Sequence, residues 1–214
     1  MKRVILYLAL IISTSSCIGD NPRTITGKGD TVSETRSLET FSKVESTIGA
    51  DINIIESEIY EVRVTLQENL LPYFNSNVSS GTLKIDFGNR SIQTQKTIVV
   101  DIYTPSLSEF MLTGAGDVTS NIAIGRLSVT GAGDITCAGE VDNLTVNLSG
   151  AANFNLYSMP VKSAYITISG TGDVYVTVEE QLDVMISGVG NVYYKGNPTV
   201  SNNISGVGNV VDRN

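Results

Sequence analysis

The second half of the chain repeats one short pattern six times: aliphatic, Ser or Thr, Gly, any residue, Gly, Asp or Asn, aliphatic. The copies occupy 112–118, 129–135, 148–154, 168–174, 186–192 and 204–210. Their first glycines are 17, 19, 20, 18 and 18 residues apart. A repeat of paired helices needs roughly 33 residues or more, so steps this short leave room only for short strands and tight corners. The pattern therefore predicts an all-β chain that winds in coils.

Aliphatic residues recur two positions apart on both sides of the glycines, which is typical of strands. If successive coils stack in register, equivalent aliphatics form two interior columns that no single coil could bury. The columns are Leu112, Val129, Leu148, Ile168, Ile186, Ile204, and Val118, Ile135, Phe154, Val174, Val192, Val210. We therefore expect a single parallel β-helix (β-solenoid), taken as right-handed, with about 18 residues per coil.

The glycines are expected at a corner where φ is positive or where the backbone leaves no room for a Cβ. Ala152 replaces the second glycine in one copy, which indicates that this position usually tolerates a negative φ. A shortened early copy, Ile48–Ile52, indicates that the coils begin before residue 112.

The Asp or Asn of each copy is the candidate functional group, because stacking would align these side chains as a solvent-facing ladder about 4.8 Å apart. The ladder is Asp117, Asp134, Asn153, Asp173, Asn191 and Asn209. We expect hydrogen bonds to local backbone or along the stack, with asparagines relieving carboxylate repulsion. Structural calcium and glycoside hydrolysis by Asp117 with Asp134 are alternatives, but simple corner geometry explains a residue that recurs in every coil.

The composition excludes several kinds of chemistry. The chain has no histidine and two cysteines, so Ser-His-Asp or Cys-His catalysis and zinc or iron sites are not expected. A net charge of −8 argues against nucleic acid or anionic lipid as a partner. Nine tyrosines are present, and those in the coils could stack on sugars if exposed, or pack half-buried between coils: Tyr157, Tyr165, Tyr175, Tyr193 and Tyr194.

The N-terminus has the features of a lipoprotein signal peptide over residues 1–16: Lys2 and Arg3, an apolar run, then small residues. Cys17 follows as the candidate lipid (palmitate) attachment site, with plain cleavage nearby as the alternative. Removal of residues 1–16 would leave 12 basic and 22 acidic residues, a net charge of −10. Cys137 would then be a lone cysteine, expected to be buried and inert. Ile18 is not the acidic residue that retains lipoproteins in the inner membrane, so we expect anchoring in outer-membrane lipid.

The rest of the chain divides into a flexible tether over 17–37 and a β-solenoid domain over 38–214. Within that domain, 38–110 is an irregular N-terminal part and 111–214 holds the regular repeats. Residues Asn69–Phe74 are expected to form a helical turn or a loop that caps the open end of the solenoid.

Several segments together resemble a known family, the head GIN domain of "putative autotransporter adhesins". The resemblance covers 38–210 and rests on Phe41, on 68–71 followed by 78–85, and on the serial Ser-Gly-x-Gly-Asp/Asn units. It implies a parallel β-helix and an adhesive role.

We therefore expect a non-catalytic lipoprotein of the cell envelope, periplasmic or surface-exposed, that binds glycan or a surface protein without a cofactor. A polysaccharide lyase or hydrolase on the same scaffold and a purely structural envelope protein are the alternatives. A homo-oligomer is left open.

Overall fold

The computed structural model describes residues 23–214, so the predicted signal peptide and Cys17 lie outside the described residues. The fold is all-β, with one 17-stranded sheet, one two-stranded sheet and no closure into a barrel. One 3₁₀ helix, η1 (Glu68–Tyr73), accompanies the strands in this part of the chain. The strands are β1 (Thr24–Thr26), β2 (Thr31–Ser37), β3 (Lys43–Ser46), β4 (Asp51–Glu56), β5 (Glu61–Gln67), β6 (Asn75–Ser79), β7 (Thr82–Asp86), β8 (Ser91–Gln93), β9 (Val99–Thr104), β10 (Leu107–Leu112), β11 (Val118–Ser120), β12 (Ile124–Val129), β13 (Ile135–Cys137), β14 (Asn143–Leu148), β15 (Phe154–Ile168), β16 (Val174–Ile186), β17 (Val192–Lys195), β18 (Thr199–Ile204) and β19 (Val210–Asp212).

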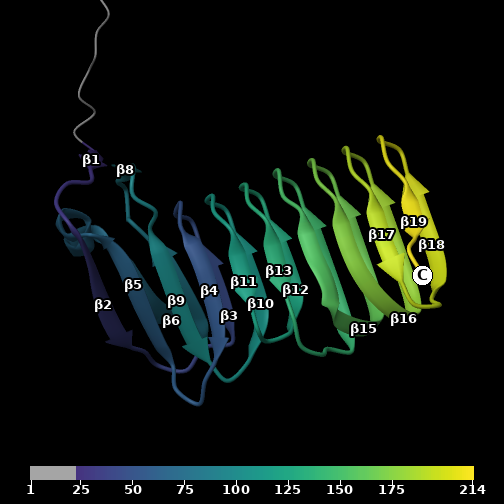
Figure 1. Cartoon of the computed structure of the whole chain (residues 1–214), viewed down its shortest axis with the longest axis horizontal. Helices are drawn as coiled ribbons and strands as arrows, with labels where there is room; N and C mark the ends of the chain where they lie inside the picture. The colour runs from purple at the N-terminus through teal and green to yellow at the C-terminus, as the bar shows by residue number, and fades with distance from the viewer. Residues whose placement is uncertain (1–22) are drawn as a thin grey trace, which may run out of the picture.

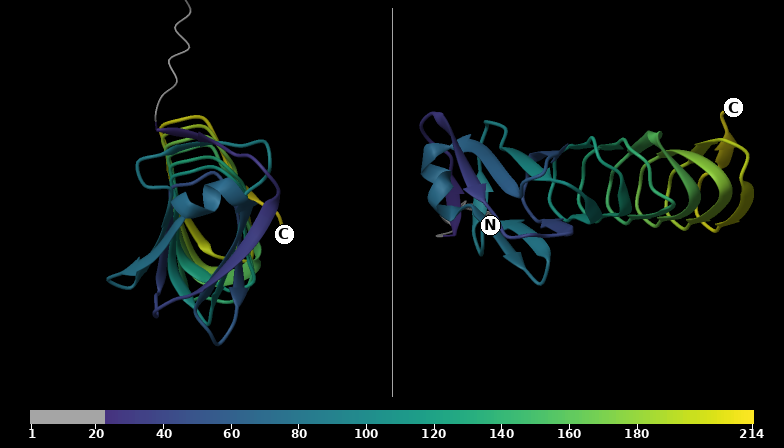
Figure 2. Two further views of the ribbon diagram at one scale, coloured as in Figure 1. Left: turned by 90° about the vertical axis from the view of Figure 1, so that its left-hand side faces the viewer. Right: turned by 90° about the horizontal axis from the view of Figure 1, so that it is seen from below.

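Two parallel ladders run along the molecule, and each places one strand segment of every coil beside its equivalent in the next (Figure 1). The first ladder is β7, β3, β10, β12, β14, the second half of β15, the second half of β16, and β18. The second ladder is β9, β4, β11, β13, the first half of β15, the first half of β16, β17 and β19. Figure 2 shows the resulting elongated shape, with the C-terminus at the end opposite β1.

The register confirms both predicted interior columns. Leu112 pairs with Val129, and the same column continues in direct register to Ile204. Val118 pairs with Ile135, and that column continues to Val210. Most members are fully buried, so each coil covers the apolar face of its neighbour.

The glycine corners lie in one line, since the residue between the two glycines of each copy bridges to its equivalent in the next coil. None of the first glycines has a positive φ. A Cβ on any of them would lie 1.6–2.1 Å from a backbone oxygen of the preceding coil. This close backbone approach explains why all six copies have glycine at the first position.

The second glycines are mixed. Gly116, Gly133 and Gly172 have φ of 126°, 138° and 146°, which only glycine adopts readily. Gly190 and Gly208 do not, and neither does Ala152. The expectation drawn from Ala152, that a negative φ is usual here, is therefore wrong for three of the copies.

The early copy also belongs to the stack. Gly49 bridges to Ala115, and Ile52 pairs with Val118. Ile48 and Ala50 occupy the positions that glycines hold in the later coils, as shown by the backbone atoms facing Gly114 and Gly116.

An N-terminal cap closes one end of the coils. η1 crosses the open end, as Figure 2 shows, and buries Leu70, while Phe74 beside it is also buried. The helical turn expected over Asn69–Phe74 is thus present as η1, and its apolar side chains are buried at this end of the molecule.

The expected tether over 17–37 is wrong for its described part. β2 pairs antiparallel with β5 over seven residues, from Thr31 opposite Gln67 to Ser37 opposite Glu61. Its inward positions include Glu34 and Arg36, which form an ion pair of 2.6 Å. Arg36 also donates to the carbonyl of Phe74 and lies over its ring. The two charges thus pair on the part-buried face of β2, although the sequence shows no apolar alternation there.

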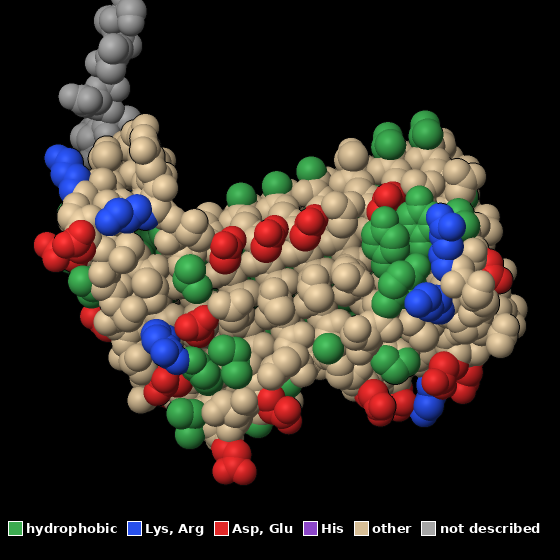
Figure 3. Space-filling model, in the orientation of Figure 1, with side chains coloured by type: hydrophobic (Ala, Val, Ile, Leu, Met, Phe, Trp, Pro, Cys, Tyr) green, Lys and Arg blue, Asp and Glu red, His purple; other side chains and the backbone are tan. Residues whose placement is uncertain are grey.

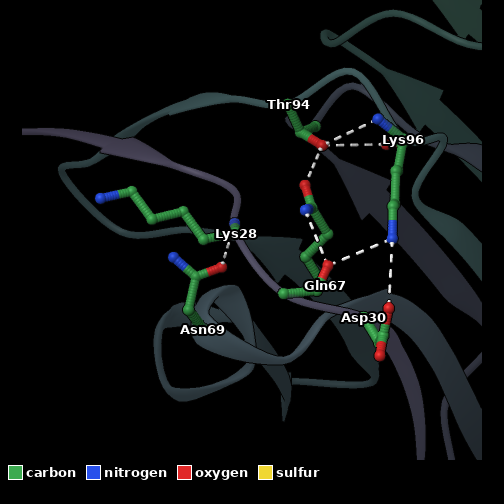
Figure 4. Close-up of polar contacts among 7 residues, drawn as sticks. Lys28, Asp30, Gln67, Asn69, Thr94 and Lys96 are labelled. Carbon is green, nitrogen blue, oxygen red and sulfur yellow. Dashed lines mark hydrogen bonds and ion pairs between the residues drawn. The ribbon is translucent and has the colours of Figure 1, made fainter.

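Side chains of the cap also fix the segment before β2 (Figure 4). Gln67, which is buried, donates from Nε2 to the carbonyl of Gly29 and accepts from the hydroxyl of Thr94 at 2.7 Å. Lys96 donates to the same carbonyl. Asn69 accepts from the amide of Lys28 and donates to the carbonyl of Thr26. Residues 24–30 are therefore part of the folded unit.

Candidate functional site: the second-ladder face

The Asp/Asn ladder is a continuous chain of hydrogen bonds between coils. The backbone N–H of Asp134 donates to Oδ1 of Asp117 at 2.9 Å, and that of Asn153 donates to Oδ1 of Asp134 at 3.2 Å. The same bond links every later pair, through Asp173 and Asn191 to Asn209. The structure thus brings all six predicted residues together.

Asp51 of the early copy extends this ladder, because it accepts the N–H of Asp117. Each asparagine of the ladder also donates from Nδ2 to Oδ1 of the ladder residue in the preceding coil. The distances are 2.9 Å for Asn153, 3.0 Å for Asn191 and 3.4 Å for Asn209. An amide therefore takes the place of a second carboxylate, which supports relief of repulsion as the reason for mixing Asp with Asn.

A group of three tyrosines lies on the outward side of the second ladder, near the C-terminal end. Tyr175 and Tyr193 are direct partners in the register, and their rings are stacked with centroids 4.9 Å apart and planes at 17°. Tyr157 meets Tyr175 edge to face at 5.6 Å. All three are partly exposed. We call Tyr157, Tyr175 and Tyr193 the tyrosine platform.

Two cations flank the tyrosine platform. Nζ of Lys195 lies 4.5 Å from the centre of the Tyr157 ring, and the guanidinium of Arg213 lies 4.8 Å from that of Tyr193. Figure 3 shows this face, with a row of red side chains leading to a green group and blue side chains at its C-terminal end.

A surface hollow of about 610 Å³ lies between the tyrosine platform and the Asp/Asn ladder. Its lining residues are Asp134, Thr136, Asn153, Asn155, Tyr157, Asp173 and Tyr175. Hydroxyl, amide and carboxylate groups thus converge beside two aromatic rings, an arrangement that can orient a polar ligand.

The surroundings modify the two platform phenols at this hollow. Desolvation raises the pKa of Tyr157 above its usual value, and the positive charge of Arg213 opposes that rise. Desolvation also raises the pKa of Tyr175, with the charge of Asp173 acting in the same direction. Both hydroxyls therefore stay protonated at neutral pH and can donate hydrogen bonds.

The other coil tyrosines are placed differently. Tyr165 is exposed on the first ladder, where its hydroxyl meets the sulfur of Met185. Tyr194 packs against the core, whereas its neighbour Tyr193 faces outward, because successive side chains of a strand point to opposite faces.

The flanking cations were not predicted from the sequence. The spacing could have found them, because Lys195 and Arg213 are 18 residues apart, as are Tyr157, Tyr175 and Tyr193. That is one coil of the repeat.

Among residues 23–214, no three His, Cys, Asp or Glu side chains gather in a way that could hold a metal ion. None of the helical structure in that range has the length and apolar character needed to cross a bilayer.

The open all-β architecture, with a polar ladder along its length and exposed tyrosines near its C-terminal end, defines an elongated protein with a repetitive outer surface. The family model described as "Putative auto-transporter adhesin, head GIN domain" matches residues 40–198, and the chain belongs to this family. That description is one of a cell-surface or envelope protein.

Solved structures share the fold. A crystal structure described as a putative adhesin, from Bacteroides fragilis, is 20% identical with a TM-score of 0.69, over 88% of this chain and 100% of that chain. Another, described as a putative lipid binding protein from Parabacteroides distasonis, is 21% identical with a TM-score of 0.53, over 89% and 100%. No curated protein matches the chain.

Proposed function

We propose that this protein is a non-catalytic, adhesin-like β-solenoid of the cell envelope that binds glycan on the second-ladder face. The observation that carries the proposal is the tyrosine platform beside the polar hollow. The tyrosine rings border the hollow with apolar edges against which a sugar can pack, and their hydroxyls can hydrogen-bond to it. Asn155 and Thr136 line the hollow and can pair with sugar hydroxyls.

The solenoid description rests on the two parallel ladders and the aligned glycine corners. A right-handed winding is proposed because connections between parallel neighbouring strands are almost always right-handed.

The absence of catalysis is proposed from the role of the ladder. Oδ1 of Asp117 and Oδ1 of Asp134 each accept a backbone N–H from the next coil. The repeated corner therefore accounts for both carboxylates without a reaction. The enzymatic alternative assigns them to general acid and nucleophile in a glycosidase.

The envelope location follows from family membership, and we propose that acylated Cys17 supplies the anchor in outer-membrane lipid. Replacement Cys17→Ala should release the protein from membranes. Membrane association that persists in this variant would contradict acylation at Cys17.

The binding proposal is tested on a glycan array with the 18–214 chain. Tyr175→Ala should abolish binding because it removes the central ring of the platform. The matched control is Tyr165→Ala, since Tyr165 is an exposed tyrosine on the first ladder. Equal loss in both variants, or no glycan bound by the parent, would contradict the proposed site.

The enzymatic alternative is tested in parallel with lyase and reducing-sugar assays. Turnover that disappears in Asp117→Asn or Asp134→Asn would replace the binding proposal with an enzymatic one. Binding without turnover is the result we expect.

A further inference from the structure

We propose that the ligand of the second-ladder face is an acidic glycan, and that Lys195 and Arg213 form the subsite for its carboxylate or sulfate group. This inference rests on the proposed glycan binding and specifies the ligand class.

The first argument is the lack of a carboxylate partner at these two cations. Within residues 23–214 there are six ion pairs, and neither Lys195 nor Arg213 takes part in one. Both side chains are exposed and lie over tyrosine rings. The chain as a whole has a net charge of −8, so two unpaired cations at one aromatic surface run against the general balance.

The second argument is the position of the two cations on neighbouring strands. Tyr194 pairs with Asp212 in the parallel register of β17 and β19, so the next residues, Lys195 and Arg213, are neighbours along the second ladder. The amide of Arg213 donates to the carbonyl of Tyr194 at 2.8 Å, which fixes this relationship. Their charged ends lie over the rings of Tyr157 and Tyr193, so both cations add positive charge to one platform. An anionic group bound there would be attracted by both, and it can accept a charge-assisted hydrogen bond from either side chain.

The third argument is that the charge of Arg213 extends over the platform. Arg213 lies over Tyr193, and its charge favours the ionised form of Tyr157 and of Tyr175. A sugar bound in the hollow beside these rings would feel the same charge, which favours an acidic substituent directed toward the guanidinium.

The carboxylates of the hollow limit how acidic the ligand can be. Asp134 and Asp173 are among its lining residues, with Asn153, whereas Lys195 and Arg213 lie outside it. They accept hydrogen bonds from neutral sugar hydroxyls but repel further anions. The site therefore fits a glycan in which an acidic sugar, such as a uronate or a sulfated sugar, alternates with neutral ones.

The experiment is an array of uronate-containing, sialylated and sulfated glycans, each beside its carboxyl-reduced or desulfated counterpart. The parent chain should prefer the acidic member of a pair by about tenfold or more, and the preference should weaken as salt rises. The double variant Lys195→Gln/Arg213→Gln should lose the preference while still binding neutral counterparts weakly. Lys84→Gln is the control, since Lys84 is an exposed lysine on the first ladder.

The outcomes separate this inference from the proposal beneath it. Equal binding of acidic and neutral counterparts, lost in Tyr175→Ala and unchanged in the double variant, would overturn the acidic subsite and leave glycan binding in place. Binding of no glycan at all would overturn both. A preference lost equally in Lys84→Gln would reduce the effect to general surface charge and also contradict the subsite.

Discussion

Oδ1 of Asp117 accepts the backbone N–H of Asp134 from the next coil at 2.9 Å, so a repeated side chain joins each turn of the molecule to the one after it. This bond engages one oxygen of a carboxylate for which calcium binding and catalysis are the alternatives. It makes the Asp/Asn ladder first of all a structural device.

Replacing Asp134 tests that role. Oδ1 of Asp134 accepts both the N–H and the Nδ2–H of Asn153. Asp134→Ala should lower the free energy of unfolding by about 1 kcal/mol in urea titrations. Asp134→Asn should not, because an amide keeps the acceptor and can donate to Asp117, as Asn153 donates to Asp134; a gain of about 0.5 kcal/mol at low salt is expected. Equal losses in both variants would contradict the hydrogen-bonding role.

Close approach at the glycine corner is tested by Gly131→Ala. The new Cβ would lie 1.6 Å from the carbonyl oxygen of Gly114, so two coils would have to separate. A loss of about 3 kcal/mol or more is expected from thermal or urea unfolding. Gly49→Ala is the control, because its Cβ would lie 3.8 Å from the nearest atom, the carbonyl oxygen of Ala115. That variant should fold normally, and similar losses at the two sites would argue against backbone crowding.

Ser46 gives a prediction of opposite sign. It is fully buried between Ile85 and Leu112 in the interior column, and its Oγ reaches no partner within the described part of the chain. Ser46→Ala should raise the free energy of unfolding by about 1 kcal/mol, because a buried hydroxyl without a hydrogen bond is unfavourable.

The matched control for Ser46 is Ser120→Ala. Ser120 is equally inward but donates to the carbonyl of Ile122 at 2.8 Å and accepts its amide. This variant should lose about 1 kcal/mol or more. If Ser46→Ala proved the more damaging of the two, its hydroxyl would have to be satisfied in solution.

The buried thiol of Cys137 should lower the free energy of unfolding at alkaline pH. Burial raises the pKa of its thiol from 9.0 to about 12. Above pH 9 the unfolded chain releases this proton while the folded chain keeps it, so unfolding becomes more favourable as pH rises towards 12. The contribution is about 1.4 kcal/mol per pH unit in that window.

The measurement is the pH dependence of the urea midpoint for the parent and for Cys137→Ala. The difference between the two should shrink as pH rises above 9, since the variant lacks the thiol. A constant difference would contradict a buried neutral thiol, as would rapid labelling of Cys137 by a thiol reagent in the native protein.

The parts of the fold that were predictable from sequence are those where a packing constraint recurs in every coil. Leu112 and Val129 share a column because one coil separates them, and Asp117 meets Asp134 for the same reason. The platform cations follow the same spacing, yet a pair such as Lys195 and Arg213 carries no repeated motif to mark it.

β2 could not be predicted because its inward face is charged rather than apolar. Glu34 and Arg36 form an ion pair, and Arg36 also contacts the carbonyl and the ring of Phe74. Phe74 is 38 residues away in the sequence and becomes a neighbour only in the folded chain. Inward charges on an edge strand also hinder pairing with a second chain. Glu34 and Arg36 therefore protect the sheet edge, although they remove the apolar alternation by which a strand is recognised in a sequence.

β1 and β2 belong to the folded unit at its N-terminal end, and this limits how far the fold could lie from a lipid anchor at Cys17. Arg23, where the described fold begins, is six residues beyond Cys17, a length of chain that spans about 20 Å at most when fully extended. With a lipid on Cys17, this connecting segment would be short, and the N-terminal end of the fold would lie close to the bilayer. The tyrosine platform would then lie toward the opposite, C-terminal end, so the elongated fold itself would hold it away from the membrane.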